Sequence, residues 1–302
     1  MNPNISVIVP VYNSPYLLGK CLDALSKQTC CTPFEAIVVD NCSDDFMELQ
    51  QLCAQFDIVK LVREFNIGSY AARNKGLSIA KGSVIVFTDA DCIPTPGWLK
   101  EGWLFLEENP DTDLLAGKVD IFPKAPNKPT IVEIFESFFS FQQENNCKNG
   151  IATTANLFIR RGVFEDLGNF DTSSPSGGDI EFTQRATVRG YSLNYAHNAV
   201  VKHPARHNLK DLRLKIERVN YGVFLLRKKC PFMKKQFELK TIIFKGAMPP
   251  LLDIKKAWRD SKDANISIGE LLGVFAILFF NKYYTFILRM GYILGIGKNN
   301  IR

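Results

Sequence analysis

The spacing of apolar and polar residues changes repeatedly along the first 90 residues, and each change predicts a switch between strand and helix. Short runs rich in valine and isoleucine are typical of buried strands, whereas apolar residues three and four positions apart are typical of helices. The predicted strands are 5–11, 35–39, 58–61 and 84–87, and the predicted helices are 15–27, 47–56 and 70–80. This order predicts an α/β fold with a mostly parallel sheet flanked by helices.

The alternation becomes less regular beyond residue 120, where Pro123, Pro126 and Pro129 predict a loop. The strands expected after this loop are 152–159 and 193–201, and the helices are 131–144, 161–167 and 179–188. Beyond residue 207 the pattern predicts only helices, over 209–229, around 237–258 and over 266–294. We therefore expect a main domain over residues 1–205, with halves 1–118 and 119–205, and a helical extension over 206–302.

The last predicted helix contains an apolar run at 271–280, which Asn281 and Lys282 interrupt. Ten residues are too few to span a bilayer, which needs about twenty. Lys282, Arg289 and three nearby tyrosines favour a helix that lies in a membrane interface. A helix packed on the core of the domain is an equal alternative, and a tilted transmembrane span is a third.

The composition is that of a globular protein, with 302 residues, 46% hydrophobic and 23% charged. A net charge of +6 is a mild basic excess, so we expect no nucleic-acid partner. Basic residues become more frequent after residue 200, which favours a membrane surface or an anionic substrate. Arg206, Lys215 and Arg218 are candidates to contact a diphosphate or an anionic acceptor, and a solvated helix face is the alternative.

The cysteines and the N-terminus both favour a cytoplasmic protein. Eight cysteines occur without a C-x-x-C pair, which favours reduced thiols over disulfides or a zinc site. No basic segment followed by an apolar region precedes the first strand, so we expect no secretory signal.

Polar residues follow three of the predicted parallel strands, at 10–13, 40–45 and 89–91. The carboxyl ends of parallel strands meet at one edge of a sheet, where ligands bind. Asp89 and Asp91 are alternate residues of an extended chain and therefore project together. Their oxygens suit Mg²⁺ or Mn²⁺, ions that usually meet substrate phosphates. An Asp pair that caps a turn or helix is the alternative.

Two common nucleotide-binding motifs are missing from the sequence. The first strand ends without G-x-G-x-x-G, since no glycine occurs before Gly19, and no G-x-x-x-x-G-K-[ST] occurs anywhere. A dinucleotide-binding Rossmann domain and a P-loop NTPase are therefore disfavoured.

Together, the order and spacing of nine short segments resemble the inverting glycosyltransferases of family 2, which have the GT-A fold. The segments are 7–13, 38–45, 66–68, 71–76, 88–91, 155–161, 168–171, 177–182 and 203–204. The resemblance covers about residues 4 to 205. It implies that residues 1–118 bind a nucleotide sugar and that residues 119–205 bind the acceptor.

The resemblance implies a role for each matching residue. Asp91 and His203 would bind Mn²⁺ or Mg²⁺, and Asp179 would be the catalytic base that deprotonates the acceptor hydroxyl. Asn156 and Glu181 would contact the acceptor. The residues around the nucleotide sugar would be Pro10, Tyr12, Asn13, Asp40, Asn41, Arg73, Asp89 and Ala90.

Each role has a plainer alternative in the sequence. Asp179 could be a helix N-cap, Asn156 a strand amide with a backbone partner, and His203 a packed residue. Asp89 could serve the ribose or the metal shell. Gly178 departs from the family, which often has Glu before this Asp, and this puts the acceptor contacts in doubt.

The implied reaction transfers a hexosyl group from a UDP- or GDP-sugar to a hydroxyl of a glycan or lipid-linked acceptor. The expected context is bacterial-type cell-surface polysaccharide assembly, by a protein peripheral on the cytoplasmic face of the membrane. Processive members carry Gln-x-x-Arg-Trp, but here Gln184, Arg185 and Ala186 occur without Trp, which favours single transfer. The alternatives are a sugar nucleotidyltransferase, which would need a glycine- and lysine-rich first loop, and a non-catalytic nucleotide-sugar-binding protein.

Overall fold

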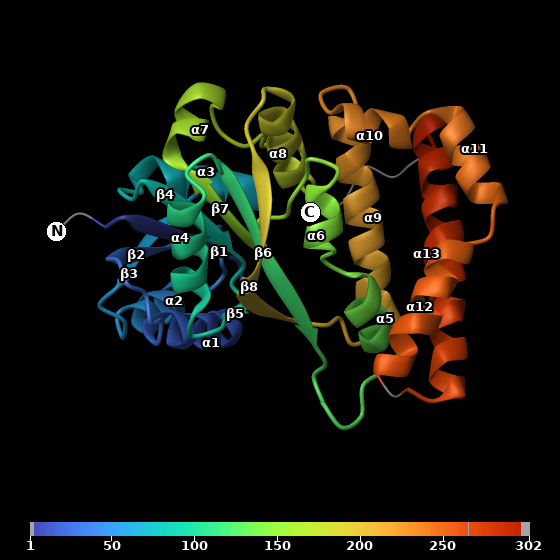
Figure 1. The fold of residues 1–302 in the computed structure, drawn as a ribbon, viewed down its shortest axis with the longest axis horizontal. Helices are drawn as coiled ribbons and strands as arrows, with labels where there is room; N and C mark the ends of the chain where they lie inside the picture. The colour runs from blue at the N-terminus through green and yellow to red at the C-terminus, as the bar shows by residue number, and fades with distance from the viewer. Residues whose placement is uncertain (1–2, 265, 297–302) are drawn as a thin grey trace. The chain divides into compact units, whose positions relative to one another are not determined.

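The computed structural model describes residues 3–264 and 266–296 (Figure 1). The chain divides into two compact units. The first, here called the sheet unit, contains the chain up to residue 120 together with 141–172 and 178–203. The second, here called the helical unit, contains 121–140, 173–177 and the chain from 204 onwards. The expected domain boundary at residue 205 stays a prediction.

An eight-stranded sheet in the order β3-β2-β1-β4-β7-β6-β8-β5 forms the centre of the sheet unit. The four strands predicted in the first 90 residues form and pair in parallel; they are β1 (Ile5–Val11), β2 (Phe34–Asp40), β3 (Val59–Arg63) and β4 (Val84–Thr88). β1, β2 and β4 consist largely of buried β-branched and aromatic residues, as expected for strands covered on both faces, whereas β3 at the edge is only partly buried.

The other half of the sheet is antiparallel, which the sequence pattern did not predict. β7 (Asn156–Arg160) runs antiparallel to β4 and to β6 (Leu114–Phe122). The two-residue β5 (Ile93–Pro94) runs antiparallel to β8 (Leu193–Pro204). Neither β5 nor β6 was expected, and β7 begins at Asn156 because residues 152–155 form a loop and turn.

Helices cover both faces of the sheet (Figure 1). On one face, Phe87 of β4 packs with Phe164, Phe170 and Phe182. On the other face, Trp98 packs against Phe158 of β7. The helices are α1 (Pro15–Ser26), α2 (Phe46–Cys53), α3 (Ser69–Ile79), α4 (Trp98–Glu108), α6 (Gln143–Cys147), α7 (Arg161–Leu167) and α8 (Gly178–Val188).

The helical unit contains six helices among the described residues. They are α5 (Ile131–Phe139), α9 (Leu209–Leu226), α10 (Pro231–Gln236), α11 (Leu239–Ala247), α12 (Leu251–Asp263) and α13 (Ile268–Ile293). The core of this unit consists of apolar residues from α5, α9, α12 and α13. Among the helices described, α13 is the one that could cross a membrane by its length and composition.

The sequence pattern placed several helix boundaries wrongly. The helix expected over 131–144 ends at Phe139, and α6 begins after Phe141, whose φ is +48°. The stretch expected around 237–258 consists of two helices, because Pro249 and Pro250 interrupt it. By contrast, the helix expected over 266–294 is confirmed as α13, whose 26 residues extend well beyond its ten-residue apolar run.

A buried carboxylate, Glu136, joins two elements of the helical unit. Its oxygens lie 3.1 Å from the Arg206 guanidinium and 2.7 Å from the Lys215 ammonium, and the Ser140 hydroxyl donates to it at 3.0 Å. Arg206 and Lys215 therefore hold a carboxylate of their own unit, which the sequence analysis did not expect. Burial raises the pKa of Glu136, but the Lys215 and Arg206 charges outweigh burial and lower it to about 2.

We predict that Glu136→Gln destabilises the protein by about 3 kcal/mol at pH 7, because two half-buried cations lose the buried charge that pairs with them. The pKa of Glu136 is lower in the folded state than its ordinary value of 4.5, so its contribution is complete above pH 4.5 and is lost as the pH falls towards 2. Urea unfolding between pH 3 and 7 should therefore show a smaller loss of stability on acidification in the variant than in the wild type. Equal losses would contradict this role of Glu136.

Candidate active site

Two carboxylates lie where the central strand β4 ends. Thr88, the last residue of β4, is fully buried, and its hydroxyl donates to the Ala155 carbonyl at 3.0 Å. The chain then turns, with the Cys92 amide donating to the Asp89 carbonyl at 3.0 Å. The side chains of Asp89 and Asp91 are 30% and 33% exposed, so both can reach a ligand.

The pairing of β5 with β8 brings His203 to these carboxylates. Ile93 lies opposite Lys202, so the next antiparallel pair places His203 beside Cys92, one residue from Asp91. The Nε2 atom of His203 lies 3.4 Å from Oδ2 of Asp91, and its ring packs 4.7 Å from the ring of Phe141. His203 is 6% exposed.

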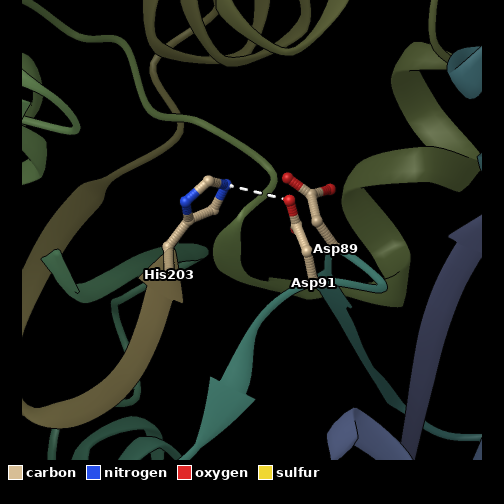
Figure 2. A group of neighbouring side chains, drawn as sticks. All are labelled: Asp89, Asp91 and His203. Atoms are coloured by element: carbon tan, nitrogen blue, oxygen red, sulfur yellow. Dashed lines mark ion pairs between the residues drawn. The ribbon is translucent and has the colours of Figure 1, made fainter. Parts of the chain in front are cut away.

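Asp89, Asp91 and His203 form a group that could hold a metal ion. One ligand atom from each lies within 4.8 Å of the other two, and Figure 2 shows all three side chains directed into one space. Two carboxylate oxygens and one imidazole nitrogen suit Mn²⁺, and the carboxylates suit Mg²⁺. Asp91 and His203 are the ligands expected from the sequence; the structure brings them together and adds Asp89 to the group.

Arg73 of α3 holds the other side of Asp89. Its guanidinium forms an ion pair with the Asp89 carboxylate and is 5% exposed. The Arg73 Nε atom is buried and has no hydrogen-bond partner among the described residues. An unpaired buried donor is costly unless a ligand accepts from it. Arg73 therefore fixes one carboxylate of the group.

Asp179 lies in the first turn of α8 with its carboxylate held in place. Its oxygens accept hydrogen bonds from the Tyr70 hydroxyl at 2.8 Å, the Thr154 amide at 3.2 Å and the adjacent Ile180 amide at 2.9 Å. Because α8 begins at Gly178, Asp179 is a residue of the helix and not its N-cap. It is 9% exposed.

Tyr70 is a site residue that the sequence analysis missed. Burial raises the pKa of Tyr70, and the charge of Asp179 raises it further, so the hydroxyl stays protonated and donates. Its ring lies 5.4 Å from the Arg73 guanidinium. No signal in the sequence marks Tyr70, since its partner Asp179 is 109 positions away.

The Tyr70 ring leaves no room for a side chain at position 178. A Cβ atom at this position would lie 2.9 Å from the Tyr70 ring, closer than side chains pack. Glycine therefore stands where the family often has Glu, and the Tyr70 ring fills the space that a side chain would need.

The loop after β2 is tied to the loop after β1. Asn13 and Asp44 exchange two hydrogen bonds, of 2.7 and 2.8 Å. Asp40 is fully buried; one oxygen accepts from the Ser43 amide at 3.0 Å, and the other lies 2.9 Å from Arg63 Nε in an ion pair without hydrogen-bond geometry. The Asn41 amide contacts the Glu64 and Asn66 carbonyls and the Gly68 amide.

The side chains of Asp40 and Asn41 therefore shape the loops that carry the exposed residues. Tyr12 is 43% exposed, Pro10 is half-buried, and Ala90 is buried at the turn after β4. Of the residues expected around the nucleotide, Tyr12 and Asn13 are the exposed ones.

The structure places the two expected acceptor residues in the protein interior. Asn156 is fully buried; it accepts from Trp98 Nε1 at 2.8 Å and donates to the Lys118 and Ala199 carbonyls at 2.8 Å. Glu181 is 5% exposed and forms a two-point ion pair with Arg185 on the same helix. These bonds satisfy both amide protons and both carboxylate oxygens, so the plainer alternative fits Asn156, and Glu181 supports α8.

Comparisons with known proteins agree on one family. The family model described as "Glycosyl transferase family 2" matches residues 6–168. A protein of Haloferax volcanii, named glycosyltransferase AglE, is 40% identical over 209 residues, which are 68% of each chain.

Solved structures share the fold over nearly the whole chain. The mannosyltransferase PcManGT from Pyrobaculum calidifontis, in complex with GDP-Man and Mn²⁺, matches with a TM-score of 0.62 and 20% identity, over 98% of this chain and 87% of that one. S. aureus TarS residues 1–349, in complex with UDP, matches with a TM-score of 0.56 and 18% identity, over 97% and 92%. The expected GT-A fold is confirmed.

We predict that Asp91→Asn weakens Mn²⁺ binding at least tenfold, because a neutral amide replaces a charged oxygen ligand. His203→Gln should weaken it as well. The measurement is titration of free Mn²⁺ by electron paramagnetic resonance, with Asp57→Asn, an exposed position on the α2–β3 connection, as the control. Unchanged affinity in both site variants would show that the metal binds elsewhere.

Proposed function

Because this chain belongs to glycosyl transferase family 2, and is therefore a glycosyltransferase, we propose that it transfers a single sugar with inversion. The donor is a UDP- or GDP-sugar, and the acceptor is a hydroxyl of a glycan or a lipid-linked glycan. The observation that carries this proposal is the Asp89, Asp91 and His203 group at the carboxyl end of β4.

On the donor side, Asp91, His203 and Asp89 would hold Mn²⁺ or Mg²⁺. The ion, when bound, neutralises the charge that develops on the leaving diphosphate. Tyr12 offers an exposed ring on which the nucleotide base can stack, and Arg73 holds the Asp89 carboxylate in place. We also assign to the donor site Pro10, Asn13 and the backbone at Ala90. The loops that carry donor-site residues are held by Asp40 and Asn41.

On the acceptor side, Asp179 is our candidate for the base. The acceptor oxygen forms a bond to the anomeric carbon while the bond from that carbon to the diphosphate breaks, and the acceptor proton passes to the carboxylate. One displacement of this kind inverts the anomeric centre. The hydrogen bonds from Tyr70 and Thr154 hold the carboxylate in one orientation.

We place the reaction in the assembly of cell-surface glycans or other glycoconjugates at the cytoplasmic face of a membrane. Two features support this setting: the basic residues after position 200 and the apolar α13. The absence of a Gln-x-x-Arg-Trp sequence supports transfer of one sugar per acceptor.

We predict that Asp179→Asn retains donor binding but lowers the turnover rate about 100-fold or more, because a general base usually contributes a rate factor of that size. Donor binding is measured as Mn²⁺-dependent thermal stabilisation by UDP- and GDP-hexoses. Turnover is measured as nucleoside diphosphate released from the same donors, with water or added glycolipid as acceptor.

Asp57→Asn is again the control, and it should match the wild type in both assays. Normal turnover by Asp179→Asn would remove Asp179 from the role of base. No stabilisation of the wild type by any nucleoside diphosphate sugar would contradict the proposed function as a whole.

A further inference from the structure

One face of α13 exposes a continuous row of uncharged residues, here called the α13 stripe. Its members are three or four positions apart and so lie on one side of the helix; they are Ile268, Leu272, Ala276, Phe279, Tyr283 and Ile287. Leu272 and Ile287 are 60% and 62% exposed. The stripe runs along about 29 Å of helix, at 1.5 Å per residue. An exposed apolar strip of this length marks an interaction site.

The opposite face of α13 packs against the core of the helical unit. Leu271, Val274 and Leu278 are buried in the core of the helical unit, where α13 packs against α5, α9, α11 and α12. The helix is therefore apolar on both faces, although the core needs only one. A helix that is apolar on both faces is expected to contact a second apolar phase or partner on the face that the core leaves exposed.

Four basic residues of α10, α11 and α13 lie close together, in a group here called the α13 basic cluster: Lys235, Lys245, Lys282 and Arg289. Burial lowers the pKa of Lys245, and the charges of Arg289, Lys235 and Lys282 lower it further. The hydrogen bonds of Arg289 within the described residues go to uncharged oxygens of Asn220 and Gln236. Clustered cations of this kind attract an anion.

The cluster and the stripe are held together by a close contact between two helices. A Cβ atom on Gly246 of α11 would lie 2.4 Å from the Phe286 ring of α13, so the glycine allows the helices to touch. Lys245 precedes this glycine, and Lys282 is one turn from Phe286. Lys282 is roughly a quarter of a turn around α13 from the middle of the stripe, so this lysine lies along one edge of the stripe.

We infer that the α13 stripe and the α13 basic cluster form a surface that binds an anionic lipid bilayer. The stripe enters the boundary between head groups and acyl chains, and the cluster binds lipid phosphates. This combination of an apolar face with flanking lysines is how helices lie in a membrane interface. The inference deepens the membrane setting of the proposed function and rests on it for its biological role, but the binding itself needs no donor or acceptor.

Two other occupants fit the surface less well. If α13 crossed the bilayer, the charged pairs Arg213–Glu217 of α9 and Lys256–Asp260 of α12, in helices packed against α13, would approach the hydrocarbon, where charges are costly. If a second copy of the chain covered the stripe, the two basic clusters would face each other and repel.

The test is co-sedimentation of the full-length chain with vesicles of phosphatidylcholine containing one half phosphatidylglycerol, compared with phosphatidylcholine alone. We expect binding to the anionic vesicles. The double variant Leu272→Ser, Ile287→Ser should bind at least tenfold more weakly, and Lys245→Ala, Lys282→Ala about tenfold or more, since each lysine near an anionic surface contributes about a fivefold effect. Matched controls are Val188→Ser, which is 72% exposed, and Lys210→Ala, which is exposed; both should bind as the wild type does.

Unchanged binding by both double variants, or no binding by the wild type, would overturn the inference. A dimer in sedimentation velocity that Leu272→Ser, Ile287→Ser dissociates would assign the stripe to a second copy. Retention in membranes after alkaline carbonate extraction would make α13 a span. Donor turnover without vesicles should be the same in all these variants. A variant that loses vesicle binding but keeps normal turnover therefore reports on this surface alone. Absence of turnover in the wild type would count against the proposed function and not against this surface.

Discussion

The hydrogen-bond register around strand β4 is the constraint on which the site depends. β4 pairs in parallel with β1 and antiparallel with β7, so its carboxyl end lies beside the amino end of β7. The first pairing sets Asp89 and Asp91 at the edge where parallel strands end. The second brings residues 154 and 155 to the same place, where the Thr154 amide contacts Asp179. A shift of one residue in either register would turn these side chains to the wrong face.

Each carboxylate of the site has a different partner, and this separates their roles. Asp89 is tied to a cation, Arg73, whereas Asp91 faces an imidazole, and Asp179 accepts from uncharged donors. Tyr70 lies between these environments, since its ring contacts the Arg73 guanidinium and its hydroxyl contacts Asp179. The position of Asp179, our candidate base, is therefore coupled to that of Asp89 through two side chains of α3, Tyr70 and Arg73.

The sequence predicts the parallel half of the sheet well because β1, β2 and β4 contain short, continuous runs of buried apolar residues, mostly β-branched. β6 and α4 escape prediction because glycine interrupts their patterns: Gly117 leaves room for the buried Asn156 amide, and Gly102 for the Phe158 ring. The metal-capable group was predictable because Asp89 and Asp91 alternate after a strand and because His203 follows in the order that resembles family 2. The Tyr70–Asp179 contact and the interior positions of Asn156 and Glu181 depend on long-range packing, which no local pattern encodes.

The central claim is that the ends of β4 and β8 together form a metal site for a nucleoside diphosphate. The most direct measurement is the anomalous scattering of manganese in crystals grown with Mn²⁺ and UDP or GDP. The account predicts one strong peak within coordination distance of Asp91 and His203, with the diphosphate on its open side. A diphosphate bound at this edge of the sheet with manganese elsewhere, or with no manganese peak, would contradict it.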